Sequence, residues 1–264
     1  MSTPTLHRRV GEVVANRPLG AYRQLSVVLP TLGVPVRPGQ FVVVPPGRPD
    51  RVLPRTWWVA GEHSEAGFGS TLELVVADSG GRPEDPLPEP GEQLPVTGPL
   101  GRGFGLPTTP VTAVVVTEGA AGAVGRWLSE RLRSVGCSTH LVSCAQDPEL
   151  HVDLVQARRS ADGVVLADPG RVADAVADVA ERTAASVLYA AGPVELSTQV
   201  AAVAARLGRV SQVTALDVGA DSVCGHGLCG SCDLPLPARG ASAVRPCTEG
   251  PVLRGDAVYW AAVE

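Results

Sequence analysis

The pattern of hydrophobic and polar positions changes once along this chain, near residue 110. Before that point, short runs rich in Val, Leu, Trp and Thr alternate with turns of Pro and Gly. Such runs are typical of strands, and a series of short strands separated by tight turns predicts a small antiparallel barrel. The expected barrel strands are residues 21–29, 40–44, 56–60 and 70–77.

After residue 110, strand-like apolar runs alternate with segments of helical period. The expected strands are residues 111–116, 138–144, 163–167, 186–190 and 210–216. Strands that alternate largely with helices predict a parallel α/β sheet with right-handed crossovers. Apolar residues three or four positions apart predict one buried face in each of three helices: Val124, Leu128, Leu132 and Val135; Val172, Val176 and Val179; Leu196, Val200, Val203 and Leu207.

The regular pattern stops after about Asp217, where a loop rich in Cys and Gly begins. A chain of 264 residues exceeds the usual length of one domain, which is about 100 to 200 residues. We therefore expect a barrel at residues 1–106, an α/β domain at residues 107–216 and a cysteine-containing domain at residues 217–264.

The composition excludes several classes of protein. Hydrophobic residues make up 44% of the chain, which is enough for a folded core. Acidic residues outnumber basic ones by 27 to 22, which argues against a nucleic-acid-binding surface. The N-terminus lacks the apolar segment of a signal peptide, and the longest apolar runs are far below the roughly 20 residues that span a bilayer. We expect a cytoplasmic protein that binds neither nucleic acid nor membrane.

Four of the six cysteines lie close together near the C-terminus, whereas Cys137 and Cys144 stand apart. In a reducing compartment this arrangement favours a metal site over disulfides. The four have the spacing C-x4-C-x2-C-x14-C, which is the plant-type arrangement of thiolate ligands around a [2Fe-2S] cluster. The expected ligands are Cys224, Cys229, Cys232 and Cys247.

Glycines within the cysteine loop support this interpretation. Gly225, Gly227 and Gly230 suit a loop that must turn tightly and direct amide N–H groups at sulfur. Structural zinc is the alternative, but zinc sites with four cysteines usually contain two close pairs. His226 raises the alternative of a Rieske centre, yet four cysteines already complete the ligation of two irons. We expect His226 to be a solvent-facing loop residue.

Four further motifs accompany the cysteines: PGQF at residues 38–41, GPLGRGF at 98–104, YAAGP at 189–193 and CTEGPVL at 247–253. With these motifs, nearly the whole chain resembles the ferredoxin-reductase superfamily. Within it, the chain is most similar to the electron-transfer subunits of heterotetrameric dihydroorotate dehydrogenases. The resemblance implies a flavin-binding-type barrel, an NAD-binding-type α/β domain and a C-terminal [2Fe-2S] domain.

The resemblance also implies cofactors and a partner. In that family the barrel binds FAD, the α/β domain binds NAD(H), and the cluster passes single electrons to an FMN-containing α/β-barrel dehydrogenase in a hetero-oligomer. NADH delivers two electrons together, a flavin can release them singly, and the cluster accepts one.

The family's flavin motif, Arg-x-x-Ser, corresponds here to Arg-Thr-Trp-Trp, so that an indole replaces the serine. A second flavin element, Gly-Thr, corresponds to Gly-Gly. The two tryptophans are interpreted either as ordinary barrel packing or as residues that occupy or stack on the flavin site. The implied flavin-site residues are Arg55, Thr56, Trp57, Trp58, Gly80 and Gly81.

The family's nicotinamide motifs are altered as well. Glu118 brings a carboxylate to the end of the first α/β strand, where the family has a run of glycines. Ala191 stands where the family has a cysteine. Altered nucleotide motifs beside an intact cysteine motif favour a changed electron source.

We therefore expect an oxidoreductase subunit that carries electrons through FAD and a [2Fe-2S] cluster to a dihydroorotate-dehydrogenase-like flavoprotein. One alternative is a non-enzymatic conduit that holds the cluster but neither FAD nor NAD. Another is a self-contained NAD(P)H reductase for an oxygenase. The five histidines are scattered and no carboxylate pair is visible, so no catalytic residue is predicted and the substrate chemistry is assigned to a partner chain.

Overall fold

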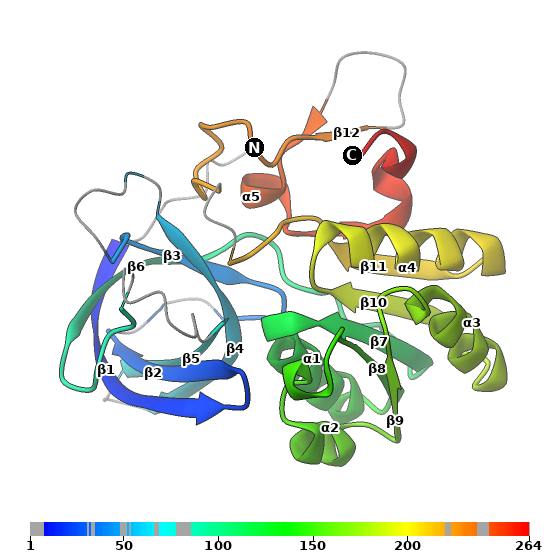
Figure 1. The fold of residues 1–264 in the computed structure, drawn as a ribbon, viewed down its shortest axis with the longest axis horizontal. Helices are drawn as coiled ribbons and strands as arrows, with labels where there is room; N and C mark the ends of the chain where they lie inside the picture. Colours follow the sequence, from blue (N-terminus) through cyan, green and yellow to red (C-terminus); the bar gives the residue numbers. More distant parts are fainter. Residues whose placement is uncertain are drawn as a thin grey trace.

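The computed structural model describes residues 8–30, 32, 35–47, 52, 54–65, 69–77, 86–219, 223–236 and 243–263. A closed barrel and a helix-covered sheet lie side by side, and the C-terminal segment lies across one end of both (Figure 1). This architecture confirms the predicted combination of an antiparallel barrel and a parallel α/β sheet. None of the helices in the described part of the chain has both the length and the apolar character of a membrane span.

The barrel contains six strands in the closed order β1-β2-β5-β4-β3-β6, and all neighbouring pairs are antiparallel. Its interior is packed with Val and Leu side chains that alternate with outward-facing residues, together with the ring of Trp57. The strands are β1 (Arg8–Leu19), β2 (Tyr22–Leu29), β3 (Phe41–Val44), β4 (Arg55–Glu65), β5 (Gly69–Ala77) and β6 (Gln93–Leu100).

Two barrel strands, β1 and β6, are missing from the strands expected from sequence. β1 exposes Val10 and Val14, so its apolar residues do not alternate cleanly between core and solvent. β6 contains Pro95 and Pro99, and proline normally argues against a strand interior because it lacks a backbone donor.

The sheet has the order β14-β11-β10-β7-β8-β9. Its first five strands along the chain pair in parallel, as predicted, whereas β14 pairs antiparallel to β11. The last strand therefore comes from the C-terminal segment, and the predicted boundaries at residues 106 and 216 stay predictions. The strands are β7 (Thr112–Glu118), β8 (Ser138–Cys144), β9 (Gly163–Ala167), β10 (Val187–Ala191), β11 (Val210–Thr214) and β14 (Val252–Arg254).

Helices cover both faces of the sheet. α1 (Gly122–Ser134) and α2 (Leu154–Ser160) pack on the face toward the barrel, and α3 (Val172–Arg182) and α4 (Val194–Leu207) pack on the other. Val135 is the exception to the predicted helix faces, because α1 ends before it and the side chain is exposed.

The C-terminal segment contains only short elements. They are β12 (Leu234–Pro235), β13 (Ala243–Val244), α5 (Pro246–Glu249), β14 and two 3-10 turns, η3 (Gly255–Ala257) and η4 (Trp260–Ala262). The largest core cluster crosses all three parts of the chain and so fixes the cysteine segment against barrel and sheet. It includes Phe41, Trp58, Val115, Leu128, Tyr189, Cys232, Cys247 and Val252.

Candidate functional site: an interface pocket and a cysteine loop

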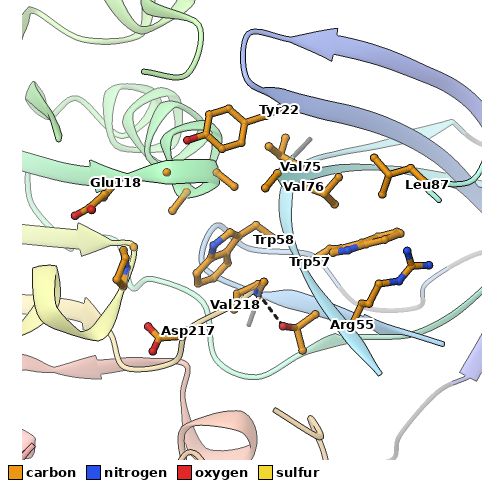
Figure 2. A pocket seen from close by; sticks show the side chains of 18 of the residues that line it. Tyr22, Arg55, Trp57, Trp58, Val75, Val76, Leu87, Glu118, Asp217 and Val218 are labelled. Atoms are coloured by element: carbon orange, nitrogen blue, oxygen red, sulfur yellow. Dashed lines mark hydrogen bonds between the residues drawn. The ribbon is translucent and has the colours of Figure 1, made fainter. Parts of the chain in front are cut away.

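A pocket of about 660 Å³ lies where the barrel meets the carboxyl ends of the sheet strands (Figure 2). The barrel side is lined by β4, by Tyr22 of β2 and by the end of β5. The sheet side is lined by the 3-10 turn η1 (Gly119–Ala121) and by the start of α4. The carboxyl edge of a parallel sheet is the usual place for ligands in α/β proteins, so this pocket is the candidate nucleotide site.

Four of the six predicted flavin-site residues meet in this pocket. They are consecutive on β4, which pairs with β3 through Val44 opposite Arg55 and Phe41 opposite Trp58. The other two, Gly80 and Gly81, lie outside the described residues.

Arg55 lies at one end of the pocket. Its guanidinium stacks 4.8 Å from the centre of the Trp57 ring and donates to the carbonyl oxygens of Pro45 and Pro86, each at 3.3 Å. Among the described residues that line the pocket, Arg55 is the only Arg or Lys. It is therefore the residue here that is best suited to a phosphate group.

The burial of both tryptophans supports their interpretation as packing residues, whereas stacking on a flavin stays a prediction. Trp57 and Trp58 are 5% and 3% exposed, with Trp57 in the barrel core and Trp58 in the core between barrel and sheet. Both rings also form part of the pocket wall. They are packing residues that give the pocket an aromatic surface.

Thr56 links the pocket to the segment that leads to the cysteines. The backbone N–H of Gly219 donates to Oγ1 of Thr56 at 2.9 Å, and the threonine is buried. This bond fixes the linker after β11 against the barrel strand.

Three carboxylates line the sheet side of the pocket: Glu118 at the end of β7, Glu195 in the first turn of α4, and Asp217 after β11. Asp217 accepts a hydrogen bond of 2.8 Å from the backbone N–H of Val194 and so caps α4. Burial, and secondly the charge of Glu195, raises the pKa of both Glu118 and Asp217 above their usual values. Glu195 and Asp217 escaped the sequence analysis, although they lie only four and three positions after the ends of β10 and β11.

The raised pKa of Glu118 predicts a pH-dependent gain in stability for Glu118→Gln. A carboxyl whose pKa is raised by folding stabilises the native state below the unfolded pKa and loses this contribution as pH rises. Glu118→Gln should therefore raise the free energy of unfolding relative to wild type at pH 8, and the difference should shrink at pH 4.5. Urea unfolding at both pH values measures this. Glu181→Gln, at an exposed position of α3, is the control; an equal gain from both variants would contradict the prediction.

The four clustered cysteines meet beside the barrel and sheet. Cys224, Cys232 and Cys247 are buried, whereas Cys229 is exposed. The Cys247 thiol interacts with those of Cys232 and Cys224, and the Cys229 thiol with that of Cys224. α5 therefore brings the remote cysteine, Cys247, to the loop that holds the other three.

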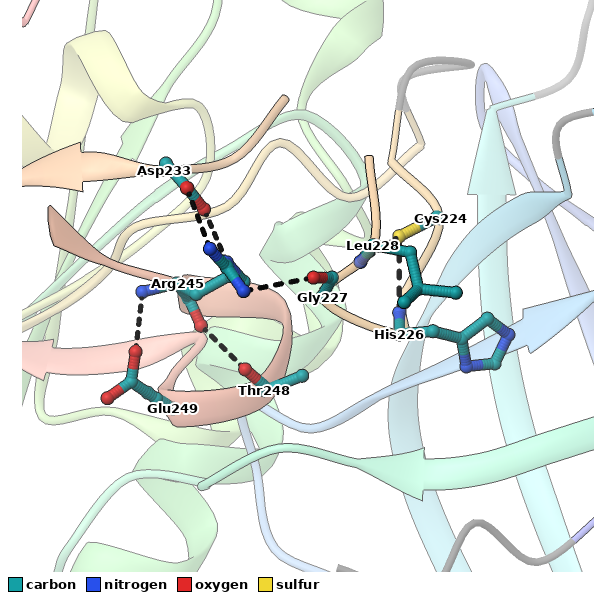
Figure 3. Close-up of polar contacts among 8 residues, drawn as sticks. All are labelled: Cys224, His226, Gly227, Leu228, Asp233, Arg245, Thr248 and Glu249. Carbon is teal, nitrogen blue, oxygen red and sulfur yellow. Dashed lines mark hydrogen bonds and ion pairs between the residues drawn. The ribbon is translucent and has the colours of Figure 1, made fainter. Parts of the chain in front are cut away.

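Backbone amides point at sulfur atoms of the clustered cysteines, and Figure 3 shows this for Cys224. The N–H groups of His226 and Leu228 donate to Sγ of Cys224 at 3.3 and 3.4 Å, and the N–H of Gly227 donates to the Cys247 thiol. Gly225 and Gly227 have φ of 74° and 72°, in the left-handed region that favours glycine. The predicted combination of tight turns and sulfur-directed amides is present.

The surroundings of the cysteine thiols give them different pKa values. Hydrogen bonds from Ser231 lower the pKa of Cys229 to about 6, whereas burial, and then the neighbouring thiol of Cys232, raises the pKa of Cys247 to about 12. The thiol of Cys229 therefore ionises more readily than that of Cys247.

The thiol contacts of Cys229 with Cys224 and of Cys247 with Cys232 are compatible with a [2Fe-2S] cluster. Within the described part of the chain, no three His, Cys, Asp or Glu side chains converge tightly enough to hold a single ion. A [2Fe-2S] cluster divides its four thiolates between two irons, so it needs only two cysteines at each. The ligand assignment itself stays a prediction.

The remaining candidates lie elsewhere. Cys137 is buried in the core between barrel and sheet, and Cys144 ends β8. Burial, and then the charge of Glu118, raises the pKa of Cys144 to about 12. His226 is half-buried rather than fully solvent-facing, and its Nδ1 atom is buried with no hydrogen-bond partner among the described residues.

Comparison with known proteins also relates the cysteine segment to an iron–sulfur cluster binding domain. Residues 223–259 match the family model of the iron–sulfur cluster binding domain of dihydroorotate dehydrogenase B. The electron transfer subunit of dihydroorotate dehydrogenase B (NAD(+)) from Listeria monocytogenes is 29% identical over 232 residues, which cover 84% of this chain and 87% of that protein. The subunit of the same name from Desulforamulus reducens is 28% identical and covers 65% of this chain and 68% of its own length.

Solved structures share the fold. The NADH-dependent reduced ferredoxin-NADP oxidoreductase, a protein of flavin-based electron bifurcation, matches with a TM-score of 0.73 and 23% identity over 95% of this chain and 90% of its own. A ferredoxin reductase of carbazole 1,9a-dioxygenase matches with a TM-score of 0.60 and 19% identity over 77% of this chain and 66% of its own. In its cysteine segment and its overall sequence this chain is similar to the electron-transfer subunits of dihydroorotate dehydrogenase B, and its fold is that of ferredoxin reductases.

Proposed function

We propose that this chain is an electron-transfer subunit, with FAD in the interface pocket and a [2Fe-2S] cluster held by Cys224, Cys229, Cys232 and Cys247. The observation that carries this proposal is the single packed core shared by the two sites. Trp58, in the pocket wall, belongs to the same cluster of buried side chains as Cys232 and Cys247. The two sites are therefore held in fixed relation by one core, as electron transfer between them requires.

The residues of the pocket suit a flavin nucleotide. Arg55 is placed to bind the pyrophosphate, and the aromatic and aliphatic wall of Trp57, Trp58, Val75 and Val76 suits a planar ring. When bound, the flavin would exchange electrons in pairs or singly, and the cluster would take one at a time. The protein contributes the position of each group and the exclusion of water from the core between them.

The sheet side of the pocket is less suited to a second nucleotide. NAD(+) appears in the names of the relatives. In this chain Gly119 and Gly192 remain at the pocket, but Glu118, Glu195 and Asp217 surround them with negative charge. Like charges oppose a pyrophosphate, so we expect NAD(H) to bind weakly here.

The partner we propose is a dihydroorotate-dehydrogenase-like flavoprotein that docks on the cysteine loop. Leu228 is 85% exposed and directly precedes the exposed Cys229, so this part of the loop can bring a cluster close to another protein. Val252, an apolar residue of the C-terminal segment, is buried in the chain's own core and is therefore not part of this docking surface. The docking face is therefore the loop of residues 225–231.

Leu228→Asp should weaken binding of the catalytic partner by about tenfold or more. The variant loses an apolar contact, and its new carboxylate must give up water when the partner binds. Binding of the purified chain to a dehydrogenase-like chain encoded beside it measures the effect. Val155→Asp is the matched control, since Val155 is 63% exposed on α2. Equal affinity of wild type and Leu228→Asp would place the docking face elsewhere.

A cluster-only conduit is the second candidate, and a specific observation favours it. Two buried indoles line the flavin-type half of the pocket and three carboxylates line the other half. Extraction of cofactors from the purified protein decides between the two. FAD together with iron and sulfide supports the first function, and iron and sulfide alone, with no uptake of added FAD, supports the second.

A further inference from the structure

Arg245 ties together the separate parts of the cysteine loop (Figure 3). Its Nε and Nη2 atoms donate to the two carboxylate oxygens of Asp233 at 2.8 and 3.2 Å, and its Nη1 donates to the carbonyl oxygen of Gly227 at 3.1 Å. Its own backbone N–H donates to the Glu249 carboxylate at 2.7 Å. The side chain thus connects the glycine-rich turn with the residue after Cys232, and the backbone of the same residue binds the last residue of α5.

These contacts lie next to the candidate ligands in both sequence and space. Asp233 follows Cys232 directly, and Arg245 precedes Cys247 by two positions. The Gly227 peptide faces both ways, because its N–H donates to the Cys247 thiol while its carbonyl accepts from Arg245. The Arg245 guanidinium also interacts electrostatically with the thiols of Cys232 and Cys247.

We propose that Arg245 is a positioning residue for the cluster, and that the Arg245–Asp233 pair sets the cluster's reduction potential. This inference rests on the cluster of the proposed function. The clamp holds the two ligand-bearing segments together across the 14 residues between Cys232 and Cys247. The charges act in opposite directions: a reduced cluster is more negative than an oxidised one, so the guanidinium favours reduction and the carboxylate opposes it.

The two charges can be removed one at a time. Arg245→Gln leaves Asp233 without its counter-charge and should lower the midpoint potential of the cluster. Asp233→Asn leaves the guanidinium without its counter-charge and should raise the potential. Both variants lose the ion pair, so each should release iron to a chelator about tenfold faster, as is common when a residue that supports a metal ligand is removed.

Arg245→Lys separates charge from clamping. It keeps the positive charge but lacks the planar fork that bonds two oxygens at once. It should therefore return the potential toward the wild-type value while iron release stays fast. The matched control is Arg254→Gln, because Arg254, the last residue of β14, makes the same two-point contact with Asp256 of η3 in an exposed position.

The experiment is an anaerobic redox titration of the full-length, iron-loaded chain, monitored by EPR, together with the rate of iron loss to a chelator. Potential shifts of opposite sign for Arg245→Gln and Asp233→Asn, with no shift for Arg254→Gln, support the inference. Unchanged potentials, or shifts of the same sign in both variants, overturn it. Wild-type protein without iron would overturn the proposed cluster itself, which makes the two failures distinguishable.

Discussion

Cys247→Ser is expected to produce the largest single effect on this protein, which is loss of the bound cluster or a strong change in its spectrum. Cys247 is the remote member of the set, 2% exposed on α5 and in contact with Cys232. An alcohol at this position is a poor substitute for a thiolate, so the iron it would hold loses one of its ligands. Iron and sulfide content, with visible and EPR spectra of anaerobically purified protein, measure the effect.

Cys137→Ser is the matched control for this experiment. Cys137 is also buried, at 6% exposure, but it does not belong to the cysteine motif, and the interactions of Cys229 and Cys247 do not include it. It should keep wild-type iron content and spectra. Wild-type iron and spectra in Cys247→Ser would refute the assignment of the fourth ligand.

Arg55→Ala is expected to lower the affinity for FAD by about 10- to 100-fold, the range that corresponds to loss of charge-assisted hydrogen bonds. The guanidinium is the only Arg or Lys among the described pocket residues, so no described neighbour can replace it. Iron content should stay unchanged, because the cysteine loop does not contain this residue. Titration of flavin-free protein with FAD, followed by flavin fluorescence, gives the affinity.

Two further variants sharpen the test of Arg55. Arg55→Lys should bind FAD with intermediate affinity, since it keeps the charge but not the paired donors. Arg23→Ala is the control, because Arg23 lies on β2 and bonds to Asn16 outside the pocket. Equal FAD affinity for wild type and Arg55→Ala would contradict the placement of the pyrophosphate at this end of the pocket.

Much of the fold follows from local pattern. Three of the parallel strands, β7, β9 and β10, contain continuous apolar runs, and such runs are typical of buried strands. β8 and β11 mix apolar and polar residues, and their place between helical segments predicts them. β1 and β6 escape because barrel closure, rather than local hydrophobicity, makes them strands: each pairs with a neighbour far along the chain. β14 escapes because its three residues become a strand only beside β11.

The candidate site likewise contains some residues that local sequence predicts and others that depend on the fold. Local spacing predicts Cys224, Cys229 and Cys232 as ligands, and the family resemblance implies Arg55 as a flavin-site residue. The carboxylates Glu195 and Asp217 depend instead on how strand ends converge in space, which no short window of sequence contains. The Arg245–Asp233 clamp likewise joins residues 12 positions apart through a turn of the chain.

Anaerobic reductive titration of the purified, full-length chain tests the central claim most directly, because it counts the electrons that the two sites accept. A flavin takes up two electrons and a [2Fe-2S] cluster one, so the account predicts about three electrons per chain, with bleaching of the flavin and the EPR signal of a reduced cluster. Uptake of about one electron, with the cluster signal alone, would contradict the claim that the chain binds a flavin. Uptake of no electrons, or of about two without a cluster signal, would contradict the claim that this chain joins a flavin to an iron–sulfur cluster.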